Sequence, residues 1–395
     1  MTHRPANPHT IAARTGVDTD TAHGSVMPPL YLSSNYSFAG FDQKRKYDYS
    51  RSGNPTRDVL AETLAELEGG AGAVITATGM AAVDLPLSIL EPGDLLIAPH
   101  DCYGGTCRLL NARARKGHFE LKLVDQGDPD ALEQALALKP KPKLVLVETP
   151  SNPLLRVVDI ADICTRAHAA GAKVVCDNTF LSPALQQPIK LGADFVVHST
   201  TKYINGHSDV VGGAVVSADA ADHEQLAWWA NCTGVTGSPF DAYLTLRGVR
   251  TLFARIERQQ ATAGRVAEAL QAHPAVKVVH YPGLKSHPNH ALAARQQSGP
   301  GAMLSFELHG GAEAVRDLVE ALDIFTLAES LGGVESLIAH PATMTHAAMT
   351  PEQRAVAGIG DGLVRLSVGL EHVEDLLADL APALDQLASR VRQAA

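Results

Sequence analysis

Short apolar runs alternate with helical patterns from about residue 65 to residue 250. Strands that are apolar on both faces and alternate with helices indicate an α/β fold, in which helices cover a large, mostly parallel sheet. The pattern predicts seven strands, at Ala73–Ala77, Leu95–Ala98, Leu121–Val124, Leu144–Val147, Val174–Cys176, Phe195–Val197 and Ala214–Val216. It predicts helices between most of them, at Met80–Leu90, Thr106–Arg115, Pro129–Leu138 and Ile160–Ala170.

The two ends of the chain have different patterns. Residues 1 to about 60 are rich in Pro, Ser, Asn, Tyr and Arg with little periodicity, which is typical of an extended, docked arm. A long helical stretch runs from about 240 to 272, and a smaller α/β unit follows Gly283. Its predicted elements are strands Met303–Leu308 and Val364–Val368 and helices Ala312–Leu322 and Val373–Val391. We therefore predict an arm at 1–62, a large domain at 63–257 and a C-terminal α/β domain at 258–395.

Composition narrows the class of protein. The 395 residues are 45% hydrophobic, enough for a large core, and the net charge of −10 without a basic block disfavours nucleic acid or an anionic membrane as partner. Five cysteines at irregular spacing, with no CxxC, indicate reduced thiols rather than a metal site at Cys102 and Cys107. The first residues lack an apolar signal region, and no apolar run approaches the ~20 residues that span a bilayer. We expect a soluble, cytoplasmic protein.

Two neighbouring strand ends carry the most informative residues, because ligands bind at the carboxyl ends of parallel strands. Lys202 follows Ser199 and two threonines directly after the strand Phe195–Val197. A lysine that is partly desolvated and held still suits a Schiff base. Asp177 ends the preceding strand and can keep a pyridine nitrogen protonated. Together these residues predict a pyridoxal 5'-phosphate (PLP) site.

Three further strand ends carry weaker signals. Gly79 and Met80 open a helix whose backbone N–H groups could bind the phosphate, together with hydroxyls of Ser199 and Thr201, although many strand-to-helix turns carry a glycine. Tyr103 either stacks on a planar cofactor or packs as a turn tyrosine. Asn152 either binds the ring hydroxyl or belongs to a plain turn.

Two further groups of residues could bind a ligand: Arg365 could bind an anion, and His198, His207 and Asp209 could be taken for metal ligands. Arg365 lies in an apolar strand pattern, and a buried arginine needs an anion. The anion is either a structural Asp or Glu or the α-carboxylate of a substrate. His198, His207 and Asp209 lack the spacing of a metal site, so we expect no metal.

Over nearly its whole length, the chain resembles the cystathionine γ-synthase/γ-lyase family of PLP enzymes. Eight segments match family motifs in the family's order: Tyr49–Arg57, Ala77–Met80, Tyr103–Gly105, Glu148–Pro153, Asp177–Phe180, His198–Asp209, Leu327–Ser336 and Arg365–Gly369. Eight ordered matches are far more specific than any one of them. Within the family, Ala98–Gly105, Ala227–Asn231 and Gly234–Gly237 are most similar to the bacterial synthases.

The resemblance implies a fold-type I PLP-dependent transferase that forms a homotetramer of two catalytic dimers, in which the arm completes the neighbouring subunit's site. It implies catalytic roles for Lys202, Tyr103 and Asp177. The implied cofactor-binding residues are Lys202, Asp177, Gly79, Met80, Ser199, Thr201, Tyr103, Asn152, Tyr49 and Arg51. The implied substrate-binding residues are Arg365, Ser330, Glu329, Asn152, Tyr49 and Ser52.

The implied reaction is γ-replacement in trans-sulfuration and methionine biosynthesis. O-succinyl-L-homoserine, or its O-acetyl analogue, reacts with L-cysteine to give L-cystathionine and succinate (or acetate). Ser52 occupies a position where several synthases have a second arginine and many γ-lyases have serine, so cystathionine γ-lyase stays an alternative. An O-acylhomoserine sulfhydrylase is less favoured. Lys202, Tyr103 and Arg365 together disfavour a PLP-binding regulator without turnover, and Gly69–Gly72 lacks the G-x-G-x-x-G spacing of a nicotinamide dehydrogenase.

Overall fold

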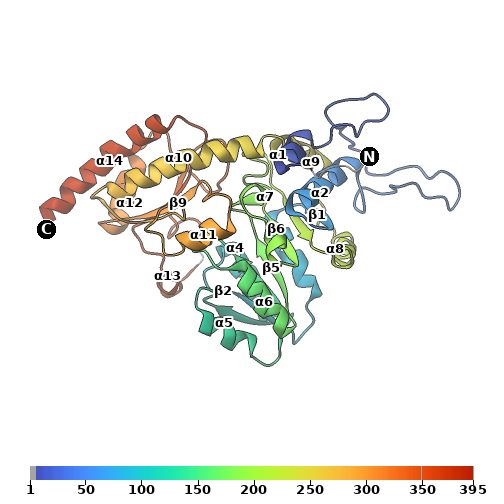
Figure 1. Ribbon diagram of the computed structural model, residues 1–395, viewed down its shortest axis with the longest axis horizontal. Helices are drawn as coiled ribbons and strands as arrows, with labels where there is room; N and C mark the ends of the chain where they lie inside the picture. The colour runs from blue at the N-terminus through green and yellow to red at the C-terminus, as the bar shows by residue number, and fades with distance from the viewer. Residues whose placement is uncertain (1–5, 348, 395) are drawn as a thin grey trace. The chain divides into compact units, whose positions relative to one another are not determined.

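The computed structural model describes residues 6–347 and 349–394, and it divides the chain into two compact units (Figure 1). The first unit contains the chain up to Glu91 together with Lys173–Phe253, and the second contains Pro92–Ala172 and the chain from Ala254 onward. The limits of the arm and the two domains at 1–62, 63–257 and 258–395 stay a prediction. Residues 1–5 of the arm lie outside the described residues. The prediction that the first residues form no signal peptide falls on this segment.

The larger sheet confirms the predicted α/β class. It has seven strands in the order β1-β7-β6-β5-β4-β2-β3. β2 pairs in parallel with β3 and β4, and β5 pairs in parallel with β6, whereas β7 runs antiparallel to both β1 and β6. The strands correspond to those predicted: β1 Gly72–Thr76, β2 Leu95–Pro99, β3 Glu120–Val124, β4 Pro142–Glu148, β5 Lys173–Asp177, β6 Phe195–His198 and β7 Gly213–Ser217.

The core of the first unit lies between α2 (Pro55–Glu68) and one face of the larger sheet, at the strands β6 and β7. Asn54 caps the start of α2 by accepting hydrogen bonds from two backbone amides, and Gly69 ends it in the left-handed conformation. Leucines of α2 pack against strand valines, and each fully buried leucine contributes ~1.5–3 kcal/mol. The other helices of this unit are α1 Pro8–Arg14, α3 Gly79–Asp84, α7 Ser182–Leu185, α8 Ala220–Thr233 and α9 Pro239–Val249, with 3₁₀-helices η1 Leu85–Ile89 and η2 Pro188–Leu191.

The second unit contains the smaller sheet, with strand order β10-β11-β12-β9-β8. Predicted strands β9 (Met303–Leu308) and β12 (Leu363–Ser367) are confirmed, and β8 Val276–His280, β10 Thr326–Leu327 and β11 Leu337–Ala339 are additional. The helices are α4 Gly104–Arg115, α5 Pro129–Leu136, α6 Ile160–Ala170, α11 His290–Gln296, α12 Gly311–Glu320, α13 Pro351–Ala357 and α14 Val373–Ala394, with most of α10 Leu252–Ala272.

Two helix predictions need correction. The helix predicted over Met80–Leu90 is α-helical only to Asp84 and continues as η1, since Pro86 lacks the N–H that an α-helix needs. The helical stretch predicted over 240–272 is two helices, because α9 ends at Val249 and α10 starts at Leu252. No helix among the described residues is long and apolar enough to cross a membrane.

We predict that the same substitution, glycine to alanine, has opposite effects on the free energy of unfolding at two helical positions. A Cβ at Gly248 in α9 would lie 2.1 Å from the carbonyl oxygen of Asn205. A Cβ at Gly264 in α10 would have no described atom within 4 Å apart from its chain neighbours and the backbone of its own helix. We expect Gly248→Ala to lower the free energy of unfolding by about 1–3 kcal/mol. Gly264→Ala should raise it by about 0.5–1 kcal/mol, because alanine favours the helix. Urea unfolding checks both, and equal effects would contradict the close approach at Gly248.

Candidate active site

Lys202 lies in a tight turn that begins where β6 ends. Its backbone N–H donates to the carbonyl of Ser199 over 3.2 Å, and its own carbonyl accepts from Gly206 N over 2.8 Å. The Thr201 hydroxyl lies 3.2 Å from the carbonyl of Gly212 and accepts from Gly212 N over 3.0 Å. These bonds leave the turn little freedom, so the half-buried Lys202 side chain starts from a fixed backbone.

Asp177, the last residue of β5, lies beside this turn. Part of its surface stays accessible, yet its carboxyl lies deep enough that desolvation raises its pKa. A hydrogen bond of 2.9 Å from Thr179 N and the charge of His198 act in the opposite direction. Thr179 also accepts a hydrogen bond from Ser199 N at its hydroxyl, over 2.9 Å, and so joins the two strand ends.

Gly79 packs directly on the Ser199 backbone. A Cβ at position 79 would lie 2.6 Å from Ser199 Cβ, so only glycine fits. Gly79 and Met80 open α3, whose N-cap hydroxyl, Thr78 Oγ1, accepts from Ala81 N. The structure therefore brings the predicted phosphate-binding residues Gly79 and Ser199 into contact within the first unit.

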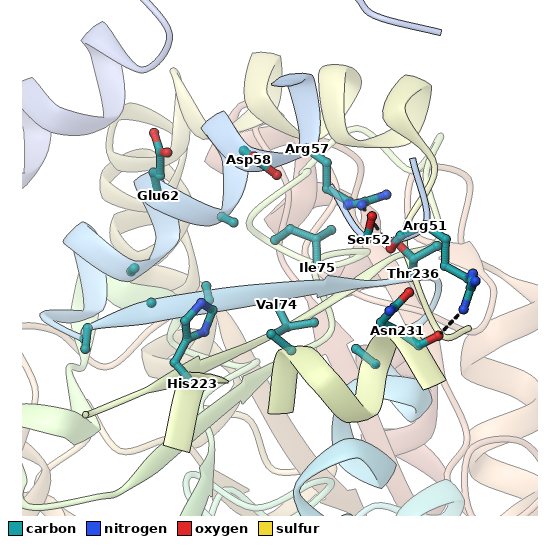
Figure 2. Close-up of a pocket in the computed structure, with 18 of the residues that line it drawn as sticks. Arg51, Ser52, Arg57, Asp58, Glu62, Val74, Ile75, His223, Asn231 and Thr236 are labelled. Atoms are coloured by element: carbon teal, nitrogen blue, oxygen red, sulfur yellow. Dashed lines mark hydrogen bonds between the residues drawn. The ribbon is translucent and has the colours of Figure 1, made fainter. Parts of the chain in front are cut away.

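The predicted arm residues lie elsewhere in the same unit, and two of them, Arg51 and Ser52, line the cavity that Figure 2 shows. Tyr49 is half exposed, and the Arg51 guanidinium lies 5.7 Å from its ring centre. Arg51 Nη1 donates to the carbonyl of Asn231 in α8 over 2.6 Å. The Ser52 hydroxyl lies 3.0 Å from the Asp48 carboxylate and 2.8 Å from the carbonyl of Tyr49.

This cavity of about 640 Å³ lies along β1, the edge strand of the larger sheet. In Figure 2, Asp58 and Glu62 come from α2 on one side of β1, and His223 and Asn231 come from α8 on the other. Small side chains and backbone of 70–75 form much of its lining. The cavity has charged groups of both signs, and its lining includes Arg51 and Ser52 but none of the residues around Lys202.

In the second unit, one carboxyl group connects two predicted site residues. Glu148, the last residue of β4, accepts from Tyr103 N over 2.8 Å at one oxygen and from Asn152 N over 3.0 Å at the other. Tyr103 follows β2, the strand that pairs with β4, and directly precedes α4. Its side chain is 41% exposed and makes no capping hydrogen bond to the helix. The sequence alone predicts no role for Glu148, although its position at the end of an apolar strand is a signal that could have identified it.

Arg365 in β12 is buried and reaches two other predicted site residues. Its Nη1 donates to Asn152 Oδ1 and its Nη2 to the carbonyl of Ser330, each over 3.0 Å. Ser330 has φ of +98°, a strained conformation for a residue other than glycine, and such strain is common at functional sites. The neighbouring Glu329 is exposed. The second unit thus brings together Arg365, Asn152 and Ser330.

His346 is a further residue of this cluster and is not among the predicted site residues. Its ring is buried, and Nε2 lies 3.1 Å from the carbonyl of Asn152. Burial lowers the pKa of His346 to about 4, and the charge of Arg365 acts in the same direction. A neutral ring donates its Nε2 proton to Asn152 and accepts at Nδ1 from the hydroxyl of Thr345 over 2.9 Å. His346 therefore fixes the backbone of Asn152.

Two thiols flank Tyr103. Cys102 is buried, and Cys107 is half-buried in the first turns of α4. A hydrogen bond from the Cys102 thiol lowers the pKa of Cys107 to about 7, although burial opposes this. The amide of Asn111 donates to the same sulfur over 3.3 Å. The same thiol pair raises the pKa of Cys102, with burial as the next cause.

We predict that alkylation of Cys107 by iodoacetamide accelerates with pH around a midpoint near 7, because the thiolate is the nucleophile. The measurement uses a Cys232→Ser background, which removes the exposed thiol. Cys102→Ala should move the midpoint up towards the ordinary value of 9, since it removes the hydrogen-bond donor. Mass spectrometry locates the modified residue. A midpoint near 9 in the protein that still has Cys102 would contradict the hydrogen bond between the two thiols.

Comparison with known proteins shows similarity over nearly the whole chain. A family model described as Cys/Met metabolism PLP-dependent enzyme matches residues 9–385. The cystathionine gamma-synthase of Escherichia coli (strain K12) is 58% identical over 381 residues, which cover 96% of this chain and 97% of that protein. The cystathionine beta-lyase of Lactococcus lactis subsp. cremoris (strain MG1363) is 47% identical over 371 residues, covering 94% and 97%.

A solved structure is similar in both sequence and fold. The crystal structure of cystathionine gamma synthase from Xanthomonas oryzae pv. oryzae in complex with aminoacrylate and cysteine is 63% identical. It superposes with a TM-score of 0.96 and covers 98% of this chain and all of that one. The structure of that enzyme in complex with cystathionine matches to the same extent.

Proposed function

The chain belongs to the family of Cys/Met metabolism PLP-dependent enzymes, and from this premise we propose that it forms L-cystathionine by γ-replacement. The substrates are O-succinyl-L-homoserine, or its O-acetyl analogue, and L-cysteine. The observation that carries the proposal is the 58% and 63% identity, over nearly full length, to two enzymes named cystathionine gamma-synthase. The reaction belongs to trans-sulfuration and methionine biosynthesis.

The residues of the first unit fit PLP. Burial disfavours the charge on Asp177, so its carboxylate needs a cationic partner, and a protonated pyridine nitrogen supplies one. Gly79 leaves no room for a side chain against Ser199, which suits a backbone cradle for a phosphate together with Met80 and Thr201. Lys202 provides the amine that binds the aldehyde. When bound, PLP withdraws electrons from the substrate's carbon skeleton through its protonated ring.

The protein's own groups then have distinct tasks in γ-replacement. The Lys202 amine would carry protons between Cα and Cβ of the substrate. Asp177 would hold the proton on the ring nitrogen of bound PLP, and Tyr103 would contact the cofactor and assist proton transfer. The Cγ–O bond breaks, and succinate (or acetate) leaves with the electron pair of that bond. The cysteine thiolate then forms the Cγ–S bond.

Arg365 binds the α-carboxylate of the substrate in this proposal. Its planar guanidinium grips a carboxylate with two hydrogen bonds, and its bonds to Asn152 and Ser330 hold it in one orientation. Asn152 also meets the ring hydroxyl. The exposed Glu329 receives the amino groups of the substrates.

We predict that Lys202→Ala is folded and nearly inactive, because no other residue supplies the amine. Steady-state turnover measures this loss, and circular dichroism verifies the fold. For the wild type, kcat/KM with succinyl-homoserine plus cysteine should exceed that with cystathionine alone. Full activity in Lys202→Ala would exclude the lysine's role, and a preference for cystathionine would indicate a lyase.

The arm acts on the neighbouring subunit in a homotetramer of two catalytic dimers, with Tyr49 and Arg51 at the phosphate and Ser52 near the substrate. Tyr49 is half exposed in the single chain. Exposed aromatic and arginine side chains are common at protein interfaces. The division at 1–62, 63–257 and 258–395 and the cytoplasmic location are part of the same proposal.

A mixing experiment tests the shared site. Lys202→Ala should be nearly inactive alone and Arg51→Ala only weakly active, and subunit exchange between them should restore part of the activity. One site of each hybrid dimer then has both residues intact. Turnover measures the activity that is regained, and native mass spectrometry measures how far the subunits have exchanged. Complete exchange without recovery would contradict an arm that acts in trans.

A second candidate is γ-elimination of cystathionine to cysteine, 2-oxobutyrate and ammonia. Ser52 favours it, as does the 43% identity to a structure described as cystathionine gamma lyase from Micromonospora echinospora, with a TM-score of 0.92. Product analysis with each substrate distinguishes the two reactions.

A further inference from the structure

Glu68 is in an energetically unfavourable position. It is the last residue of α2, it is fully buried, and its carboxyl group lies at the helix end that carries negative partial charge. Burying ionisable groups is costly, and well-packed apolar side chains are often at least as stable in their place. The location of Glu68 therefore calls for a reason other than stability.

Its contacts supply that reason. Glu68 Oε1 lies 2.7 Å from Nε2 of His198 and accepts from Nδ2 of Asn178 over 2.9 Å. His198 is the last residue of β6, and Asn178 directly follows β5. One oxygen atom of α2 therefore joins two neighbouring strand ends. Asn178 is itself held at Oδ1 by Gln186 Nε2 over 3.1 Å.

The residues next to these two contacts are those that serve the cofactor. Asp177 precedes Asn178, and Ser199 follows His198. Asp177 and Ser199 are therefore each one position away from a residue that Glu68 contacts. Thr179 joins the same two strand ends through Asp177 Oδ1 and Ser199 N. Both Thr179 and Glu68 thus connect the two strand ends.

We propose that Glu68 is a positioning residue for PLP: through His198 and Asn178 it fixes the strand ends that carry Asp177 and Ser199. This inference rests on the proposed PLP-dependent function. Burial raises the pKa of Asp177, and the charge of His198, the residue that Glu68 contacts, acts in the opposite direction. Glu68 touches neither the substrate nor the cofactor in this role.

Cofactor binding tests the proposal without measuring turnover. Apoprotein is titrated with PLP, and visible circular dichroism of the bound cofactor reports its orientation. Glu68→Gln retains the size of the side chain but removes its charge and one of its oxygens. We expect PLP affinity to fall about tenfold, as for outer-shell partners of metal ligands, together with a changed dichroic band. Asn178→Ser, which removes one of the two contacts, should act in the same direction with a smaller effect.

Thr63→Ala is the matched control. Thr63 is a buried residue of the same helix, and its hydroxyl bonds to Thr15 and to the carbonyl of Val59 instead of to the strand ends. This variant should lower the melting temperature and leave PLP affinity and the dichroic band unchanged.

The outcomes separate this inference from the proposed function. If the wild type binds no PLP, the proposed function fails and the inference fails with it. If the wild type binds and Glu68→Gln keeps the same affinity and band, only the inference is overturned. Equal weakening by Thr63→Ala would also overturn it, because a loss of helix stability would then explain both variants. If Glu68→Gln does not fold, Asn178→Ser decides by the same criteria.

Discussion

The close approach of two glycine backbones to the Lys202 turn is the constraint on which the site depends. Gly79 lies against Ser199 at the start of the turn, and Gly248 lies against the carbonyl of Asn205 at its end. A methyl group at either position would enter occupied space. The turn is therefore held between α3 and α9, and the backbone that carries Lys202 has little room to move. The proposed role of Lys202 as the PLP-binding amine would benefit from this, since small displacements at a reacting centre reduce rates strongly.

Buried carboxyl groups serve a similar purpose in each unit. Glu68 joins the ends of β5 and β6, and Glu148 joins the segments that follow β2 and β4. Each pair of strands is adjacent and parallel. Adjacent parallel strands present their carboxyl ends at the same edge, where irregular backbone begins and N–H groups lose their ladder partners. Glu148 satisfies one such backbone N–H with each of its two oxygens. Glu68 instead uses one oxygen for two side chains, Asn178 and His198, that lie at the ends of its pair of strands.

Much of this arrangement could be predicted from the sequence because it depends on local patterns. The seven short apolar runs define the strands, and parallel strands place Asp177 and Ser199 at one edge. The contact between Glu68 and His198 could not be predicted, since 130 positions separate the two residues and neither belongs to a local motif for it. The same holds for His346 and Asn152. Strands β10 and β11 were missed because two or three residues are too few to show a period.

The fold alone does not select between γ-replacement and elimination. Enzymes named synthase and lyase share this fold with the chain at 63% and 43% identity. The choice must therefore lie in residues that neither the core nor the PLP chemistry fixes. Ser52 is such a residue, because it is exposed and its hydroxyl bonds only within its own turn, to Asp48 and Tyr49, in the part of the chain that the structure describes. A serine there contributes no positive charge, so an anionic acyl group that approaches it depends on other cations for recognition.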